Sequence, residues 1–277
     1  MNLIYNEKKL KALIAKMATD GPGKLHILTD FDRTLSEASV IDGKTVGSII
    51  GLLRAGHYLT PQYSAESFAL FEKYHPLEND QTIPRVERMN KMEEWWKKHN
   101  DLLIQSKLNK RDMDNAMIAG HLKLREGVVE SFKLLQKNNV PVVIMSGGPA
   151  YMIQKQLELS GILTENVHIV ANYYEYDADG YMINYKKPII HSQNKYEIIL
   201  RKFPFFAQLK ERTNVVLLGD QIDDLGMIEG FDYSNLLTIV FANKKEREEQ
   251  FADKFNVVIG GDGDFNFVNN ILKQILC

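Results

Sequence analysis

The sequence predicts an α/β fold in which helices cover both faces of a mainly parallel sheet. Short apolar runs typical of buried parallel strands alternate with helical stretches over most of the chain. Three of these runs end in polar clusters, at Asp30–Asp32, Ser146–Gly147 and Asp220–Asp224. Because parallel strands bring their carboxyl ends to one edge of a sheet, we expect the three clusters to form a single site.

The composition is that of an ordinary globular protein. The 277 residues carry 34 Lys and Arg against 36 Asp and Glu, so the chain lacks the basic excess of a nucleic-acid-binding protein. No apolar run approaches the roughly 18 residues of a membrane span, and the N-terminal residues have no signal-peptide core. The single cysteine, Cys277, allows no intramolecular disulfide. We therefore expect a cytoplasmic monomer without a membrane or nucleic-acid partner.

The N-terminal part of the core is a helix followed by a strand. Leu10, Leu13 and Met17 form one stripe of a helix over residues 6–18, which Gly21-Pro22-Gly23 ends. The strand over residues 24–29 runs directly into Asp30.

A long insertion, residues 37–123, follows with little β patterning. It has helical patterns over residues 65–73, 84–106 and 111–118, separated by prolines. We predict a helical cap domain over residues 37–123, inserted into an α/β core made of residues 1–36 and 124–277.

The core resumes with alternating helices and strands. The pattern predicts helices over 128–138, 150–159, about 195–202 and from about 267, and strands over 140–145, 166–171, 214–218, 237–242 and 256–259. A hairpin over residues 173–185 turns at Asp177-Ala-Asp-Gly180.

The two aspartates after the first strand suit phosphoryl transfer. Side chains two apart on extended backbone point the same way, so Asp30 and Asp32 can face one site. Asp30 can attack phosphorus, and Asp32 can protonate the leaving oxygen and later accept a proton from water. Mg²⁺ held by Asp30 and Asp220 would offset the repulsion between the carboxylates and the phosphoryl oxygens.

The other clusters offer groups for the phosphate. Ser146 supplies a hydroxyl, and the Gly147 N–H lies near a predicted helix start, where anions bind well. Lys195 precedes the third cluster and can supply the fixed cation that phosphoryl transfer requires.

These residues resemble the motifs of the haloacid dehalogenase superfamily. Asp30-Phe-Asp-Arg-Thr-Leu-Ser36 resembles its first motif, D-x-D-x-T, and Ser146, Lys195 and Gly219–Asp224 resemble the second, third and fourth in the expected order. The resemblance implies a Rossmann-like core and Mg²⁺-dependent chemistry through an aspartyl-phosphate.

Four further segments resemble the cytosolic pyrimidine 5'-nucleotidase family, also called cytosolic 5'-nucleotidase III. They are Tyr74-His-Pro-Leu-Glu78, Met92-Glu-Glu-Trp-Trp96, Leu124-Arg-Glu-Gly127, and Asn172 before an acidic hairpin. This resemblance spans nearly the whole chain and implies hydrolysis of nucleoside 5'-monophosphates such as UMP or CMP.

The family resemblance also implies roles for individual residues. Asp30 would be the nucleophile and Asp32 the acid/base, with Mg²⁺ on Asp30, the Asp32 carbonyl and Asp220. Ser146, Gly147 and Lys195 would hold the phosphate. Asp224 would support the metal from outside its coordination shell. Glu78 and His99 would contact the nucleoside.

Departures from the family pattern leave the base preference open. Arg33 stands where the family has methionine and Gly147 where it has alanine, neither of which changes the chemistry. His75 and Pro76 near Glu78, and His99 in place of a serine, lie in the nucleoside part. The alternatives are a phosphatase for 7-methylguanosine monophosphate or another phosphomonoester, a phosphotransferase, and a non-catalytic nucleotide-binding or regulatory protein.

Two groups of residues are assigned to ordinary structural roles. We expect Trp95 and Trp96 to pack within the cap, since tryptophan is more often a packing residue than a ligand. The mixed charges of residues 244–249 are typical of a solvated helix face.

Overall fold

The computed structural model describes residues 2–4, 7–78, 80–196, 200–229 and 232–277. Its centre is a seven-stranded sheet in the order β1-β11-β10-β9-β2-β5-β6. The strands are β1 (Asn2–Ile4), β2 (Leu25–Thr29), β5 (Val142–Pro149), β6 (Val167–Asn172), β9 (Asn214–Gly219), β10 (Asn235–Ala242) and β11 (Val257–Gly260). All adjacent pairs are parallel except β1, which joins the β11 edge antiparallel. The predicted α/β fold, with a Rossmann-like core, is confirmed.

Alternate residues along the strands point into two separate cores. On β2, Ile27 packs into one apolar cluster and Leu28 into the other. The first cluster is covered by α1 (Glu7–Asp20), α6 (Val128–Lys137), α7 (Ala150–Leu159) and α11 (Asn266–Leu276). The second is covered by α9 (Phe206–Leu209), the 3₁₀ turn η2 (Ile222–Ile228) and α10 (Glu248–Phe251). The central strands are therefore buried on both faces, which explains their continuous apolar runs.

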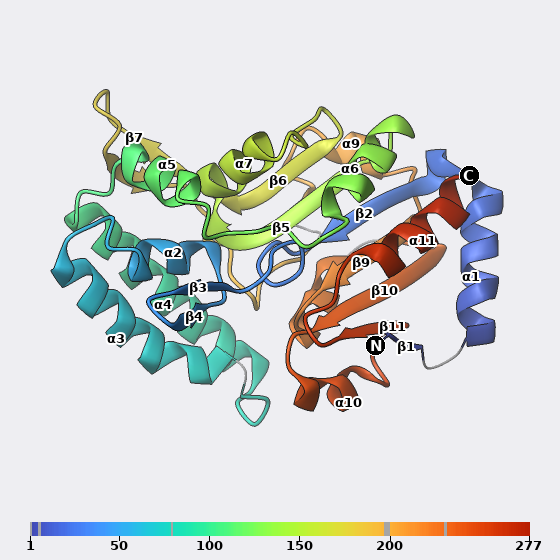
Figure 1. Ribbon diagram of the computed structural model, residues 1–277, viewed down its shortest axis with the longest axis horizontal. Helices are drawn as coiled ribbons and strands as arrows, with labels where there is room; N and C mark the ends of the chain where they lie inside the picture. Colours follow the sequence, from blue (N-terminus) through green and yellow to red (C-terminus); the bar gives the residue numbers. More distant parts are fainter. Residues whose placement is uncertain (1, 5–6, 79, 197–199, 230–231) are drawn as a thin grey trace.

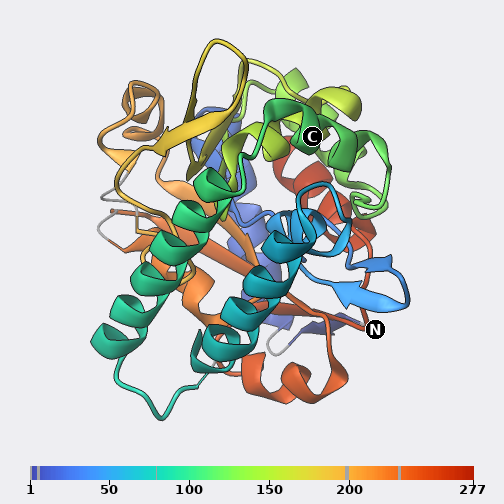
Figure 2. The same cartoon turned by 90° about the vertical axis from the view of Figure 1, so that its left-hand side faces the viewer.

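Segment 37–123 is mainly helical and lies beside the end of the sheet at which β2 finishes (Figure 1). It contains α2 (Ile49–Ala55), α3 (Pro61–Glu78), α4 (Arg85–Gln105) and α5 (Lys110–Ile118). Figure 2, turned toward this end, shows α3 and α4 side by side in front of the sheet. The hairpin of β7 (Tyr174–Tyr176) and β8 (Met182–Tyr185) is present as predicted.

Three predictions within segment 37–123 need correction. The segment contains a hairpin of β3 (Ser39–Ile41) and β4 (Lys44–Val46), which the sequence analysis missed. Its turn is Asp42-Gly43, with φ of 49° and 73°, the Asp-Gly signature of a tight hairpin. The seven-residue helix α2 was also missed, because it is too short for a clear 3.6-residue period. Helix α3 is longer than the predicted 65–73.

Two predictions in the core also need correction. The antiparallel edge strand β1 was not predicted, since three residues give little pattern. The helix expected near residues 195–202 falls partly on 197–199, outside the described residues, and Lys195 and Tyr196 are not helical.

Candidate active site

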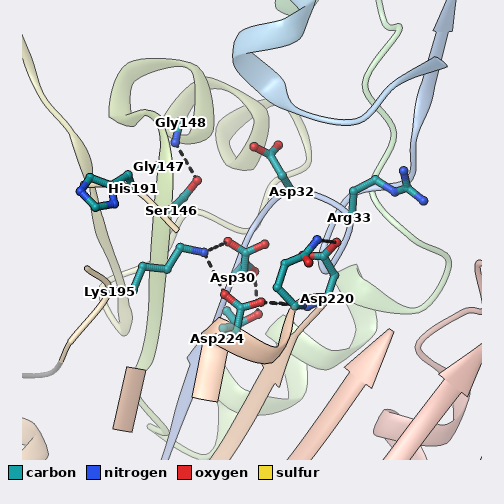
Figure 3. A network of polar contacts seen from close by, with 12 residues as sticks. Asp30, Asp32, Arg33, Ser146, Gly147, Gly148, His191, Lys195, Asp220 and Asp224 are labelled. Atoms are coloured by element: carbon teal, nitrogen blue, oxygen red, sulfur yellow. Dashed lines mark hydrogen bonds and ion pairs between the residues drawn. The ribbon is translucent and has the colours of Figure 1, made fainter. Parts of the chain in front are cut away.

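The three polar clusters meet because of the strand order. β2 lies between β9 and β5, so the ends of these three parallel strands are adjacent. Figure 3 shows the result, with Asp30 at the centre, Ser146 and Lys195 on one side and Asp220 on the other. The single site predicted from the sequence is therefore present.

The loop after β2 is held by main-chain and buried polar contacts. The Asp30 N–H donates to the Leu218 carbonyl of β9 at 3.0 Å, which fixes where the strand ends. Arg33 adopts a left-handed φ of 63°. The buried Arg125 guanidinium donates to the carbonyls of Arg33, at 2.7 Å, and Thr34, at 3.0 Å. The turn that carries both aspartates is thus fixed from outside the site.

Three carboxylates form one buried group. Oxygens of Asp30, Asp220 and Asp224 all lie within 4.8 Å of one another. Burial raises the pKa of Asp30 to about 6, and the Lys195 ammonium opposes this. Burial, followed by the charges of Asp224 and Asp30, raises the pKa of Asp220 well above its ordinary value. Such crowding of negative charge is relieved by a cation, and an all-oxygen set suits Mg²⁺.

Lys195 supplies one positive charge to this group. Its ammonium donates to Asp30, and to Asp224 at 3.0 Å. Burial lowers the pKa of Lys195, but the Asp224 and Asp30 carboxylates outweigh burial and raise it above its ordinary value. The other Asp224 oxygen accepts the N–H groups of Asp220 and Gln221, each at 3.0 Å. Asp224 therefore orients both the lysine and the loop that carries Asp220.

Asp32 stands apart from the three carboxylates. One of its oxygens accepts the Ile49 N–H at 2.7 Å, at the start of α2. Burial and the neighbouring Asp30 raise the pKa of Asp32 to about 8. A carboxyl with this pKa carries a proton at neutral pH and can donate it.

Ser146 and Gly147 lie in the last part of β5, where its pairing with β6 is irregular. The Ser146 hydroxyl accepts the Gly148 N–H at 3.0 Å, just before α7. The Asn172 amide donates to the carbonyls of Gly147, at 2.7 Å, and Ile190, at 2.9 Å. Asn172, which entered the sequence analysis only through a family motif, thus joins the end of β5 to the segment leading to Lys195.

A cleft of about 530 Å³ joins these groups to segment 37–123. This volume is within the range of small-molecule sites. Of the residues predicted from sequence, it is lined by Asp30, Asp32, Glu78, His99, Ser146, Gly147, Lys195, Asp220 and Asp224. The structure therefore brings all nine predicted site residues to one cavity.

Glu78 and His99 lie in the helical wall of this cleft. Glu78 accepts a hydrogen bond from His75 Nδ1 at 3.0 Å. Burial raises the pKa of Glu78, but hydrogen bonding and the positive charges of His75 and Lys195 together outweigh burial and lower it. His99 is buried, with Nε2 3.1 Å from the Tyr63 hydroxyl. Burial, and then the charge of Arg54, lowers its pKa to about 3, so the ring is neutral.

Several lining residues were missed or assigned differently from sequence. Trp95 and Trp96 line the cleft as well as packing, and a Cβ on Gly147 would lie 3.3 Å from the Trp96 ring. Lys244 and Arg247, assigned to a solvated face, also line the cleft. Arg54 had no motif to mark it, because α2 was not recognised.

The profile of the family described as pyrimidine 5'-nucleotidase (UMPH-1) matches residues 33–276. The chain belongs to this family. It is accordingly an enzyme of the 5'-nucleotidase class, a phosphomonoester hydrolase.

Named relatives align with nearly the whole of this chain. The chain is 32% identical over 278 residues to the human 7-methylguanosine phosphate-specific 5'-nucleotidase, covering 99% of this chain and 92% of the relative. It is 31% identical to the chicken (Gallus gallus) protein of the same name, covering 99% of this chain and 95% of the chicken protein. A Caenorhabditis elegans relative, named putative cytosolic 5'-nucleotidase 3, is 27% identical, covering 99% and 75%.

Solved structures share the fold. The crystal structure of cytosolic 5'-nucleotidase IIIB bound to cytidine matches with a TM-score of 0.86 and 26% identity, covering 99% of this chain and 93% of that one. A substrate-bound phosphoserine phosphatase matches with a TM-score of 0.55 at 20% identity, covering 90% and 97%, which shows the shared core fold. Within the described residues, no helix has the length and apolar character needed to cross a bilayer.

Proposed function

We propose that this 5'-nucleotidase hydrolyses nucleoside 5'-monophosphates through an aspartyl-phosphate on Asp30. The observation that carries the proposal is the position of the Asp30 carboxylate. It follows directly after β2, contacts the Lys195 ammonium and lines a cleft of about 530 Å³. Attack of its oxygen on phosphorus forms the P–O bond to Asp30 as the bond to the nucleoside oxygen breaks.

Asp32 is proposed as the acid and base. The Ile49 N–H holds one carboxyl oxygen of Asp32, and the other oxygen is then available to a substrate in the cleft. In the first step Asp32 gives a proton to the departing nucleoside oxygen. In the second it accepts a proton from the water that attacks phosphorus and releases Asp30.

Ser146, Gly147 and Lys195 are proposed to hold the phosphoryl oxygens. Ser146 and Gly147 line the cleft on the β5 side, and Lys195 lines it beside Asp30. Donors fixed before the reaction stabilise the charge that the transferring group spreads over its oxygens.

The three-carboxylate group fits Mg²⁺. The ion would be held by Asp30, the Asp32 carbonyl and Asp220. Asp224 would orient both Lys195 and the loop that carries Asp220. Bound there, the ion would neutralise negative charge on the phosphoryl oxygens. The raised pKa of Asp220 is the observation that supports a cation at this place.

Segment 37–123 is proposed as a cap domain that encloses the nucleoside. Glu78 and His99 face the cleft from α3 and α4, opposite the strand-end groups. Ion pairs between Arg88 and Asp223, at 3.1 Å, and between Arg85 and Glu229 close this segment onto the core. An enclosing cap excludes bulk water from the reaction.

The base preference has two candidates. The family description favours a pyrimidine, as in UMP or CMP. A 7-methylguanosine monophosphate is favoured by the names of the human and chicken relatives. We propose the pyrimidine class. We also propose that the protein is a monomer and that it is cytoplasmic, as the names of the Caenorhabditis elegans relative and of the solved structure suggest.

The test is phosphate release from UMP, CMP, AMP, GMP and 7-methyl-GMP, with Mg²⁺ or with a chelator. The wild type should release phosphate only with Mg²⁺, and Asp30→Asn should lose roughly 10⁴-fold or more of the activity. Activity that survives the chelator or the substitution would contradict the proposed chemistry. Release from none of the substrates would favour a non-catalytic binding protein, and nucleoside-dependent transfer would indicate a phosphotransferase.

A further inference from the structure

Arg54 is a buried cation in the cap wall of the cleft. It belongs to α2, lines the cleft and is only 7% exposed. Its guanidinium lies over two aromatic rings of α3, with Cζ 4.3 Å from the Phe71 centroid and 5.5 Å from that of Phe68. The side chain is therefore held in place by stacking.

Arg54 differs from the other buried arginines in its polar contacts. Arg88 pairs with Asp223, and Arg125 pairs with Asp262 and donates to carbonyls. Within the described part of the chain, Arg54 makes no hydrogen bond and no ion pair. Burying an unpaired charge is costly, so a buried arginine usually has an acceptor. Stacking occupies the face of a guanidinium and leaves its N–H edge free to donate.

The groups around Arg54 indicate what kind of ligand this part of the cleft can bind. Trp96 and neutral His99 lie in the same wall, with ring centroids 5.9 Å apart, and Phe71 stacks on His75. These rings fit a planar aromatic group. Among the described cap residues that line the cleft, the formal charges are those of Arg54 and Glu78, and Glu78 already accepts from His75. The open donor in this wall is Arg54.

We infer that Arg54 selects the base by its charge, donating to a carbonyl oxygen of a neutral base and disfavouring a cationic one. The inference rests on the proposed nucleotidase function and specifies its substrate class. Pyrimidines such as uracil are neutral and present carbonyl oxygens. Methylation of N7 gives guanine a positive charge, which the fixed and largely buried Arg54 guanidinium repels. This chain therefore differs in base preference from relatives named for 7-methylguanosine phosphate.

The first experiment compares kcat/KM for UMP and 7-methyl-GMP, at a mildly acidic pH that keeps the methylated base cationic. The wild type should prefer UMP. Arg54→Met removes the charge while keeping a side chain that can pack on Phe71, and it should reduce the UMP to 7-methyl-GMP ratio roughly ten- to hundredfold. Arg54→Lys keeps the charge and should retain discrimination against the cationic base.

A matched control removes one positive charge from the cap outside the cleft. Lys97 is exposed on α4 and does not line the cavity. Lys97→Met should leave the substrate ratio unchanged, which excludes an effect of net charge alone.

A binding experiment gives a readout independent of turnover. The protein's 2 tryptophans, Trp95 and Trp96, both line the cleft, so tryptophan fluorescence reports occupancy. In an Asp30→Asn background, uridine should bind more tightly than 7-methylguanosine, and adding Arg54→Met should reduce or reverse this order.

Two results would overturn the inference: a wild-type preference for 7-methyl-GMP, or a ratio that Arg54→Met leaves unchanged. Both can occur while Mg²⁺-dependent release lost in Asp30→Asn persists, so the nucleotidase proposal would stand. Failure of that proposal would instead appear as no Mg²⁺-dependent release from either substrate.

Discussion

The strand-end part of the cleft and its cap wall are built in different ways. The strand-end groups follow directly from three adjacent parallel strands and are held by main-chain contacts, such as Asp30 N–H to Leu218 O. The cap wall brings together side chains from three helices, α2, α3 and α4, through ring stacking and single hydrogen bonds. They include Arg54 from α2, Glu78 from α3 and His99 from α4.

This difference suggests that the strand-end groups carry out the reaction and that the cap wall selects the substrate. Groups fixed by a buried sheet are precise, because shifting them would disturb the central strands. Groups on the helices of segment 37–123 lie outside the central sheet, so a change such as the histidine at 99, where the family has serine, leaves the strands in place. We therefore expect substitutions at strand ends to reduce turnover of every substrate, and substitutions in the cap wall to alter mainly which substrate is used.

The largest effect is expected at the strand-end carboxylates. Asp220→Asn removes one of the three crowded carboxylates and should reduce activity roughly 10³-fold on all substrates, with a higher Mg²⁺ requirement. Phosphate release across a Mg²⁺ titration measures both. Asp223→Asn is the matched control, because Asp223 lies in the same loop but pairs with Arg88 and Gln193. Equal losses in the two variants would contradict the metal assignment.

A smaller and selective effect is expected in the cap wall. Glu78→Gln should reduce kcat/KM for UMP about ten- to hundredfold, and far less for an aryl phosphate that has no nucleoside. Steady-state kinetics on the two substrates check this. Glu94→Gln serves as the control, since Glu94 bonds Lys98 and Tyr74 and does not line the cleft. If Glu78→Gln reduced both activities equally, Glu78 would belong to the chemistry rather than to recognition.

The smallest effect is expected on the stability of the folded protein, through His99. Burial lowers the pKa of His99 from 6.5 to about 3, so the folded state disfavours its protonation. Neutral His99 therefore contributes stability above pH 6.5, and this contribution is lost as pH falls and the unfolded chain takes up the proton. Relative to wild type, His99→Gln should be destabilised most above pH 6.5, by about 1–3 kcal/mol, and progressively less toward pH 4.

Urea unfolding at several pH values measures this difference. The buried aspartates titrate in both proteins, so their effects cancel in the comparison. A difference that grew on acidification would mean that His99 is charged in the folded protein.

The same contrast explains what could be predicted from sequence. Asp30, Ser146 and Asp220 each follow a short apolar run, so their place at one sheet edge follows from general rules for parallel strands. Lys195 was placed through its order in the chain, although Lys195 itself is not helical as expected.

The cap wall could be predicted only in part. Glu78 and His99 were found through a family motif, but Trp96 was assigned to packing and Arg54 was not identified. Their positions depend on how α2, α3 and α4 pack, and no local period in the sequence encodes that arrangement. The missed β3–β4 hairpin had a local signal, the Asp42-Gly43 turn, which was outweighed by the helical character of its surroundings.

The most direct test of the strand-end chemistry is to trap the covalent intermediate. Enzyme mixed with phosphate-labelled UMP and Mg²⁺ is quenched in acid within a single turnover, and its peptides are mapped by mass spectrometry. Phosphate is expected on Asp30, absent with the chelator and absent in Asp30→Asn. Phosphate on another residue, or turnover in Asp30→Asn at the wild-type rate, would contradict it.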